Sequence, residues 1–271
     1  MTDSFMVGII GTGEMGRPLI DRLLAAGHPV SAFARRPEVV ADLYAAGVDV
    51  VGRPPEVAAG SRAVIIYVYS DEQVRQVLVD DGVADAMESG STIIVHTTGS
   101  PRTVEAVAGR LAGRDVAIID APGSGGPAQV AAGALTLFVG GETEVVDRCR
   151  PLFESYASHV VHFGPLGSGQ KVKLLNNLLF GAQVQLALEM SRLADDFGLD
   201  AREVAGTLHT CSGASYATDL VAAMGATNLI TSAGRFIKKD VITARAVSGE
   251  LRARLGALDA AVEPLLRRIP D

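Results

Sequence analysis

Residues 8–16 read Gly8-Ile9-Ile10-Gly11-Thr12-Gly13-Glu14-Met15-Gly16, and they follow directly on an apolar run that begins at Phe5. Such a run ending in glycines predicts a buried parallel strand. Apolar residues at helical spacing continue over residues 15–26, and Gly27 stands where a helix takes a left-handed cap. A second strand is predicted at residues 30–34. A strand, a glycine-rich loop, a helix and a strand in this order are the pattern of a dinucleotide-binding βαβ unit.

Each glycine of this G-x-G-x-x-G loop has a physical task. The first makes the tight turn, the second lets a pyrophosphate approach the backbone, and the third lets the helix pack closely on the strand. Unpaired N–H groups at the helix N-terminus then bind the phosphates. A structural turn without a ligand is the alternative interpretation. The residues expected to hold the cofactor are Gly11, Thr12, Gly13, Glu14, Met15 and Gly16.

The end of the second strand indicates which dinucleotide binds. Sites that prefer NAD usually carry Asp or Glu there, which binds the ribose 2′-hydroxyl. This chain carries Arg35 and Arg36 instead. Two guanidinium groups suit a 2′-phosphate, which they meet with charge-assisted bonds. We therefore expect NADP, with NAD possible; a solvated surface turn is the other interpretation of the pair.

Strands and helices keep alternating as far as residue 163, which predicts a doubly wound, mainly parallel sheet. Further strands are expected at residues 48–51, 63–69, 92–96, 116–120, 134–139 and 160–163. Helices are expected at residues 38–46, 55–59, 71–78, 102–112 and 145–156.

The pattern changes after Gly164-Pro165-Leu166-Gly167-Ser168-Gly169, because residues 170–197 form one long helical pattern without proline and no later strand is evident. The predicted fold is α/β, with an N-terminal Rossmann-type domain over residues 1–166. An all-α domain with a long connecting helix is expected over residues 167–271. Few residues remain to cover that apolar helix, so we expect it to form a subunit interface in a homodimer or tetramer.

Composition excludes several classes of function. The chain has 271 residues and a net charge of −7, which argues against a broad surface for nucleic acid. No apolar run approaches the ~18–20 residues of a membrane span, and no signal peptide is evident. We expect a cytoplasmic enzyme. Cys149 and Cys211 are too few for a disulfide framework or a cysteine metal site, and no catalytic metal is predicted.

The long helical pattern contains polar residues where apolar ones are expected. Lys173 and Asn177 are four residues apart and share one helix face inside an otherwise apolar stretch. Burial lowers the pKa of an ammonium group, which makes a lysine in a dry cleft useful for proton transfer near neutral pH. A lysine that extends to solvent at the start of a helix is the alternative.

A second polar stretch, Asp120-Ala121-Pro122-Gly123-Ser124-Gly125-Gly126-Pro127, follows a predicted strand. Its glycines leave backbone N–H groups available and Ser124 adds a hydroxyl, so this loop is suited to bind a carboxylate. A plain turn is the alternative.

Taken together, these segments resemble the β-hydroxyacid dehydrogenase family, which includes 3-hydroxyisobutyrate dehydrogenases, tartronate semialdehyde reductases and glyoxylate/succinic semialdehyde reductases. The resemblance covers most of the chain in the family's order. The matching segments are residues 8–16, 120–126, 133–141, 167–177 and 236–240.

The resemblance implies a role for each matching residue. Lys173 is similar to the catalytic lysine, and Asn177 to the asparagine that holds the substrate or orients that lysine. Ser124, Gly125 and Gly126 resemble the carboxylate-binding loop. The remaining matches are Thr98 near the nicotinamide end of the cofactor, Lys239 as a cofactor contact, Asp240 near the substrate, and Arg35 as in NADP-using members; Tyr69 occupies a further position near the cofactor.

Some positions depart from the family's pattern. His96 stands where the family often has Asp-x-Ser-Thr, and we interpret it as a structural histidine, like His28, His159, His162 and His209. Gly123 replaces a frequent valine and widens the expected pocket. Tyr69 replaces a small aliphatic residue, and the C-terminal region is shorter than in typical members. These changes affect the identity of the substrate more than the type of reaction.

The expected function is reversible hydride transfer between a β-hydroxy acid and NADP, with Lys173 as general acid and base and the Ser124 loop on the substrate carboxylate. Two alternatives remain. One is an imine or keto reductase on the same scaffold, and the other is a non-catalytic NADP-binding module.

Overall fold

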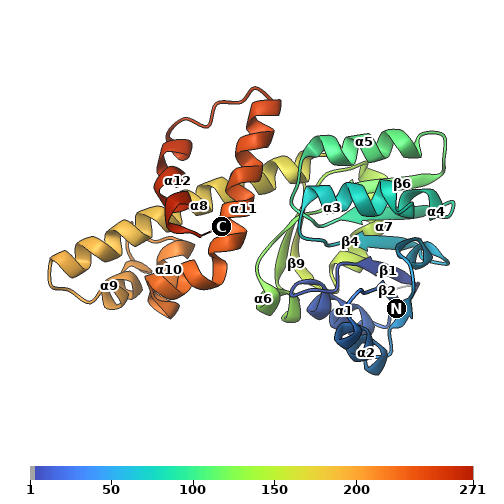
Figure 1. Ribbon diagram of the computed structural model, residues 1–271, viewed down its shortest axis with the longest axis horizontal. Coiled ribbons are helices and arrows are strands. Elements are labelled where there is room, and N and C mark those ends of the chain that lie inside the picture. The colour runs from blue at the N-terminus through green and yellow to red at the C-terminus, as the bar shows by residue number, and fades with distance from the viewer. Residues whose placement is uncertain (1–3, 271) are drawn as a thin grey trace. The chain divides into compact units, whose positions relative to one another are not determined.

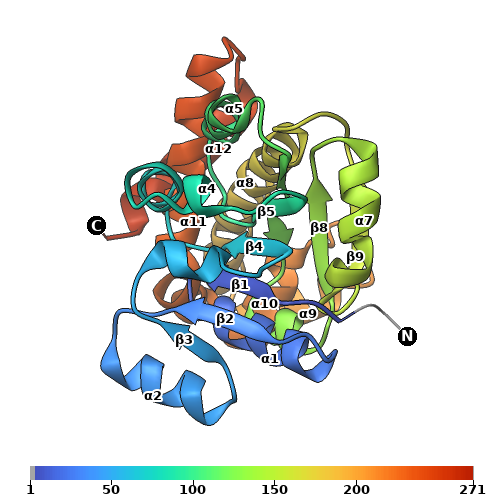
Figure 2. The same ribbon diagram turned by 90° about the vertical axis from the view of Figure 1, so that its right-hand side faces the viewer.

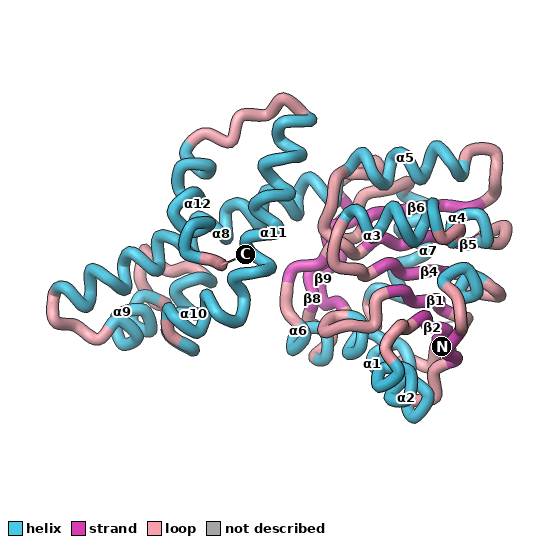
Figure 3. Tube along the Cα trace, in the orientation of Figure 1, coloured by secondary structure: helices cyan, strands magenta, loops and turns pink. Residues whose placement is uncertain are grey.

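The computed structural model describes residues 4–270. The chain divides into two compact units, the first extending to Lys173 and the second beginning at Leu174 (Figure 1). The first unit combines strands and helices, and the second contains helices (Figure 3). No helix within the described residues is long and apolar enough to span a membrane.

A six-stranded, wholly parallel sheet forms the centre of the first unit, with the order β3-β2-β1-β4-β5-β6. Its strands β3, β2, β1, β4 and β5 are labelled in Figure 2. The direction of winding reverses between β1 and β4. In open α/β sheets, ligands bind outside the carboxyl ends of the strands at such a point. The strands are β1 Val7–Ile10, β2 Val30–Phe33, β3 Asp49–Val51, β4 Ala63–Ile66, β5 Ser91–Val95 and β6 Val116–Asp120.

Helices cover both faces of this sheet because consecutive strand residues point to opposite faces and nearly all are apolar. Ile9, Ile65 and Ile94 pack with one set of helices, α1 Gly16–Ala25, α2 Pro37–Ala45 and α7 Thr143–Phe153. Ile10 and Ile66 pack on the other face, against η1 Pro54–Ala58, α3 Asp71–Arg75, the π-helical turn η2 Gln76–Asp80, α4 Val83–Ala86 and α5 Pro101–Leu111. The predicted doubly wound sheet is confirmed.

The two strands predicted after residue 130 do not extend this sheet, and a short strand at Gly123–Ser124 was not predicted. β7 Gly123–Ser124, β8 Leu135–Val139 and β9 Ala157–His162 form a separate sheet, with β7 antiparallel to β8 and β8 parallel to β9. Gly125, with φ +129°, follows β7, and the short helix α6 Pro127–Ala131 then leads the chain back into β8. β6 ends where the backbone of Asp120 pairs with that of Gly140.

Two elements of the first unit end at other residues than the sequence predicted. The predicted strand over residues 63–69 ends at Ile66, because the carbonyl of Val68 accepts a hydrogen bond from the Thr97 hydroxyl rather than from a strand. The expected helix over residues 71–78 changes to π-helical geometry after Arg75. Such single turns are not visible in a hydrophobic pattern.

The helical unit has its own core. It contains most of α8 Ser168–Asp196, which begins in the first unit, and α9 Ala201–Leu208, α10 Tyr216–Met224, α11 Ala226–Glu250 and α12 Ala257–Arg268. Leu178, Val221 and Val241 belong to a buried apolar cluster to which all five helices contribute. The prediction of an all-helical C-terminal region is confirmed for the described residues.

Candidate cofactor and substrate site

The glycine loop joins β1 to α1, and its three glycines differ in the space around them. A Cβ on Gly11, whose φ is +113°, would overlap the backbone of Tyr67. A Cβ on Gly16 would overlap the carbonyl of Gly11. A Cβ on Gly13 would meet nothing within 4 Å. Two glycines are therefore required by the fold, and the middle one leaves open space where a pyrophosphate would approach.

The rest of this loop is accessible. Thr12 and Met15 are half-buried and Glu14 is exposed. The Met15 side chain makes no cap for α1, although the Arg17 N–H already donates to the Gly13 carbonyl at 2.9 Å, so the N-terminus of α1 can still take an acceptor from outside the protein. Phosphate oxygens are suitable acceptors at such a position. The residues present therefore fit a dinucleotide.

The two arginines follow β2, and both are exposed. Arg36 is the residue before α2, and its Nε lies 3.8 Å from Glu38 Oε1, with both side chains more than two thirds exposed. An ion pair this exposed contributes little, so Glu38 does not fix the guanidinium. Both cations follow the carboxyl end of β2, where the 2′-phosphate is expected.

Tyr69 and Thr98 lie beyond the carboxyl ends of β4 and β5, the strands next to the switch point. Tyr69 is half-exposed and its backbone N–H donates to Gln73 Oε1 at 2.9 Å. Thr98 is half-buried. Its neighbour Thr97 is buried and donates its hydroxyl to the Val68 carbonyl at 3.0 Å, which joins the two loops.

Asp120 is a functional candidate that sequence reasoning missed. It is the last residue of β6, and its side chain is fully buried. One carboxylate oxygen accepts from the Gly167 N–H at 2.6 Å and the other from the Gln170 N–H at 2.7 Å. Burial raises its pKa to about 6, although these backbone bonds oppose the shift. The sequence feature that could have identified it is an acidic residue at the end of an otherwise apolar strand.

Gln170 is the second missed candidate. Its amide is buried, donates to the Thr97 carbonyl at 2.7 Å and accepts from the Gly99 N–H at 2.9 Å. The start of α8 is thereby bonded to the loop after β5. A glutamine in a glycine-rich segment gives no pattern that would identify this role.

Lys173 and Asn177 lie one turn apart on α8 and are 9% and 7% exposed. These fractions exclude the alternative of a lysine extended into solvent. Asn177 Nδ2 donates to Asp240 Oδ2 at 2.6 Å, and Lys239 Nζ lies 2.8 Å from Asp240 Oδ1. The structure therefore brings Asn177, Lys239 and Asp240 together in the helical unit.

The Ser124 loop begins in β7, where Ser124 pairs with Thr136 of β8. Gly125 adopts a φ of +129°, which favours glycine. The Gly126 N–H, expected to be available to a carboxylate, donates instead to Gln129 Oε1 at 2.9 Å because Gly126 precedes α6. The Ser124 hydroxyl and the Gly125 N–H remain the expected donors of this loop.

His96 is fully enclosed in the first unit. Its Nε2 lies 3.0 Å from the Tyr156 hydroxyl, and its Nδ1 bonds the Ala121 carbonyl. Burial lowers its pKa to about 4, so the ring is neutral at physiological pH. Tyr67 and Phe153 also pack against it. These contacts fit a structural histidine rather than an acid catalyst.

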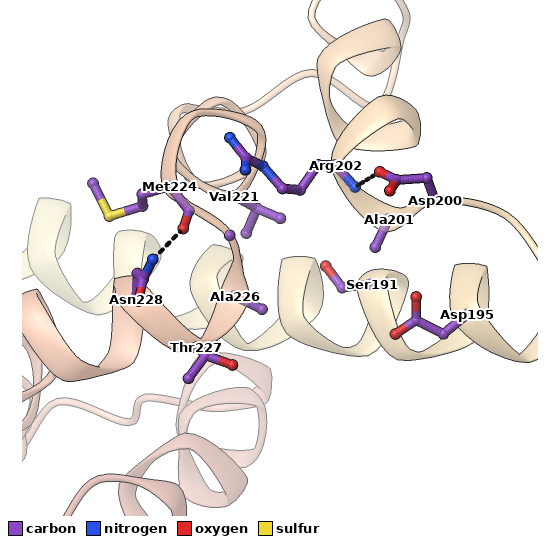
Figure 4. Close-up of a pocket in the computed structure, with 11 residues that line it drawn as sticks. Ser191, Asp195, Asp200, Ala201, Arg202, Val221, Met224, Ala226, Thr227 and Asn228 are labelled. Carbon is purple, nitrogen blue, oxygen red and sulfur yellow. Dashed lines mark hydrogen bonds between the residues drawn. The ribbon is translucent and has the colours of Figure 1, made fainter.

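The helical unit contains a separate open cavity of about 350 Å³ between the ends of four helices (Figure 4). Arg202 donates to the carbonyls of Ala222 and Ala223, which caps the end of α10. None of the residues expected at the site lines this cavity. Within the described residues, no three His, Cys, Asp or Glu side chains form a metal-binding group.

Two family profiles match the chain. The profile described as the NAD binding domain of 6-phosphogluconate dehydrogenase matches residues 6–164. The profile described as NAD-binding of NADP-dependent 3-hydroxyisobutyrate dehydrogenase matches residues 167–268. Together they cover nearly the whole chain, and the break between them lies directly before α8.

Individual proteins agree with these profiles. The chain is 32% identical to a Pseudomonas aeruginosa NAD-dependent L-serine dehydrogenase, over 79% of this chain and 72% of the relative. It is also 32% identical to a 3-hydroxyisobutyrate dehydrogenase of the same organism, over 81% and 73%. The solved structure of Mycobacterium tuberculosis 3-hydroxyisobutyrate dehydrogenase with L-serine matches with a TM-score of 0.88 at 26% identity, over 98% of this chain and 94% of that one.

Proposed function

Because this chain belongs to the β-hydroxyacid dehydrogenase family, we propose that it interconverts a β-hydroxy acid and its semialdehyde or keto acid, with NADP as the preferred cofactor. The chain is an oxidoreductase of CH–OH groups with a nicotinamide-dinucleotide domain. One observation supports a specific proton-transfer group. Lys173, an ionisable residue, is buried on α8, and this helix begins against the carboxyl ends of β5 and β6.

The preference for NADP rests on Arg35 and Arg36. They stand where an acidic residue would hold an unphosphorylated ribose, and both side chains are exposed directly after β2. The profile matching the helical region is described from an NADP-dependent enzyme, whereas one relative is named as NAD-dependent. The arginine pair therefore supports NADP from the residues of this chain itself.

Lys173 is the proposed proton-transfer group. The nicotinamide accepts or supplies the hydride when the cofactor is bound. Lys173 Nζ takes the proton of the substrate hydroxyl in the oxidation direction and returns it to the carbonyl oxygen in reduction. Its low exposure excludes bulk water, which strengthens the electrostatic interaction with the reacting oxygen.

Substrate binding is assigned to two groups of residues. The Ser124 hydroxyl and the Gly125 N–H bind the substrate carboxylate, with Gly126 shaping the loop. In the helical unit, Asp240 holds the amide of Asn177 and pairs with Lys239. We expect Asn177 to orient the substrate or the lysine, and Lys239 to contact the cofactor.

The exposed face of α8 supports self-association as a homodimer or tetramer. Large apolar side chains lie along it, and three of them, Leu179, Leu186 and Leu193, recur at seven-residue spacing. Such a row is typical of a helix that packs on another helix. The whole row, each member at least 43% exposed, is Leu175, Leu179, Leu186, Leu193 and Phe197. A cytoplasmic location stays a prediction from the sequence.

An activity screen tests the proposal. Small 3-hydroxy acids, including 3-hydroxyisobutyrate and L-serine, are offered with NADP⁺ and NAD⁺, and small semialdehydes with NADPH and NADH. We expect turnover of at least one β-hydroxy acid, faster with NADP(H). Turnover confined to cyclic imines would support the reductase alternative. NADPH binding without turnover of any compound would indicate a non-catalytic module, and both results contradict the proposal.

A further inference from the structure

The start of α8 is bonded to the sheet by side chains that the mechanism above does not use. The first N–H groups of a helix have no partner within the helix and need acceptors elsewhere. Here Asp120, 47 residues before Gly167 in the chain, accepts from the N–H groups of Gly167 and Gln170. A carboxylate at a helix N-terminus is also favoured by the helix dipole. Two N–H groups at the start of α8 are therefore capped by a residue of β6, while the Ser168 N–H donates to the nearby Pro165 carbonyl.

Two glycines allow this close approach. A Cβ on Gly140, at the end of β8, would lie 2.8 Å from the Ser168 nitrogen and 2.9 Å from the Gly169 nitrogen. A Cβ on Gly169 would overlap the carbonyl of Phe138. The first turn of α8 consequently packs directly on the backbone at the end of β8. A side chain at position 140 or 169 would push the first turn of α8 away from Asp120.

Gln170 connects the same turn to the loop after β5. Its amide uses both of its polar atoms, on the Thr97 carbonyl and the Gly99 N–H. These two partners are the residues before and after Thr98, which is expected at the nicotinamide end of the cofactor. Gln170 is only 1% exposed, so water does not compete for either bond.

We propose that Asp120 and Gln170 are positioning residues that hold the first turn of α8, and Lys173 one turn beyond it, against the Thr97–Gly99 loop. Lys173 is three residues after Gln170 and lies on the same face of the helix. The network thus fixes the lysine relative to Thr98 without touching substrate or cofactor. This inference rests on the proposed role of Lys173.

Retaining a buried carboxylate here has an energetic cost. Taking an ionised group out of water is unfavourable, and burial raises the pKa of Asp120 above its usual value. Lys171 acts in the other direction, as do the N–H groups of Gly167 and Gln170. An apolar residue would avoid this cost but would remove the Asp120 acceptors of the Gly167 and Gln170 N–H groups.

The test uses Gln170→Leu, which removes both amide bonds at similar volume, and Gln170→Glu, which keeps an acceptor for the Gly99 N–H. Asp200→Asn is the control for a change at another helix start, because Asp200, like Asp120, accepts from two backbone N–H groups, those of Arg202 and Glu203, but at α9 in the helical unit. Each full-length variant is characterised by kcat and KM with the best substrate, by the Kd for NADPH, and by hydrogen exchange.

We expect kcat of Gln170→Leu to fall by about 10- to 100-fold, since small misplacements of a reacting group have effects of this order. KM and the NADPH Kd should stay within about threefold, Gln170→Glu should recover part of the loss, and Asp200→Asn should match the wild type. Amide exchange should accelerate together in residues 97–100 and 167–174. A kcat within about twofold of wild type, or exchange that changes in only one segment, would overturn the proposal.

The exchange readout separates this inference from the proposed function. If the wild type turns over no β-hydroxy acid, the function fails, whereas coupled exchange in Gln170→Leu still supports the network. Coupled exchange with normal kcat would show that the network stabilises the fold alone, and would overturn the positioning role.

Discussion

The carboxyl group of Asp120 makes folding stability depend on pH in a way that can be isolated by one substitution. Burial raises its pKa from 3.8 to about 6, so the folded protein binds this proton more tightly than the unfolded chain does. A protonated Asp120 therefore favours folding at low pH. As pH rises from about 4 to about 6, the folded state must ionise a buried group, and this contribution to stability is lost.

The magnitude follows from the two pKa values. A difference of about two units corresponds to about 3 kcal/mol over the whole range, at about 1.4 kcal/mol for each unit. About 2 kcal/mol of this falls between about pH 4.5 and about pH 7. Asp120→Asn does not titrate, although it loses one acceptor for an α8 N–H. The stability that Asp120→Asn loses with this acceptor is therefore the same at every pH.

Urea unfolding of both proteins at several pH values gives the difference. The chain has five tyrosines and no tryptophan, and four of the tyrosines, all but Tyr216, lie in the first unit. Tyrosine absorbance therefore reports mainly on the unit that contains Asp120. The stability of the wild type relative to Asp120→Asn should fall by about 2 kcal/mol from about pH 4.5 to about pH 7.

A difference that is constant with pH would show that the Asp120 pKa is the same in the folded and unfolded states. A difference that grows with pH would show that the backbone bonds from Gly167 and Gln170 outweigh burial. Either result refutes the reasoning. Asp200→Asn, in the helical unit, serves as the control for capping carboxylates in general.

Three further changes test other parts of the account. Replacing Arg35 and Arg36 by alanine should raise the NADPH Kd by about 10- to 100-fold in a fluorescence titration, with a much smaller effect on NADH; equal effects would contradict the 2′-phosphate assignment. Gly16→Ala should weaken NADPH binding at least about tenfold, because its Cβ overlaps a loop carbonyl, and unchanged affinity would contradict the loop geometry. Leu186→Glu should lower the mass found by sedimentation while Leu251→Glu does not, and a wild-type monomer would exclude the α8 interface.

Much of the fold was predictable because its signals are local. The glycine loop between an apolar run and an amphipathic helix located the first βαβ unit, and apolar strands separated by helices indicated the parallel sheet. The change at residues 164–169 indicated the helical region in the same way. What the pattern did not show was that the strands after Asp120 form their own sheet. That outcome depends on the pairing of Ser124 with Thr136, and pairing partners leave no periodic signal.

In the candidate site too, residues that interrupt a local pattern could be predicted, and contacts between distant residues could not. Lys173 and Asn177 were noticeable because they interrupt an apolar helix. The bond between Asn177 and Asp240 joins residues 63 apart, and Asp120 reaches Gly167 across 47 residues. Only the folded chain brings such groups together, and no spacing rule predicts them. Family resemblance supplied Asp240, whereas nothing in the sequence analysis assigned a role to Asp120 or Gln170.

The central claim is that Lys173 moves the proton when the hydride is transferred. The most direct measurement compares single-turnover rates of Lys173→Ala and Lys171→Ala with saturating NADP⁺ and the best β-hydroxy acid. Lys171 is exposed on the same helix, two residues earlier, and is the matched control. Lys173→Ala should lose about 10²- to 10⁴-fold in rate with an unchanged NADPH Kd, and Lys171→Ala should match the wild type. A Lys173→Ala rate close to the wild-type rate would contradict the account.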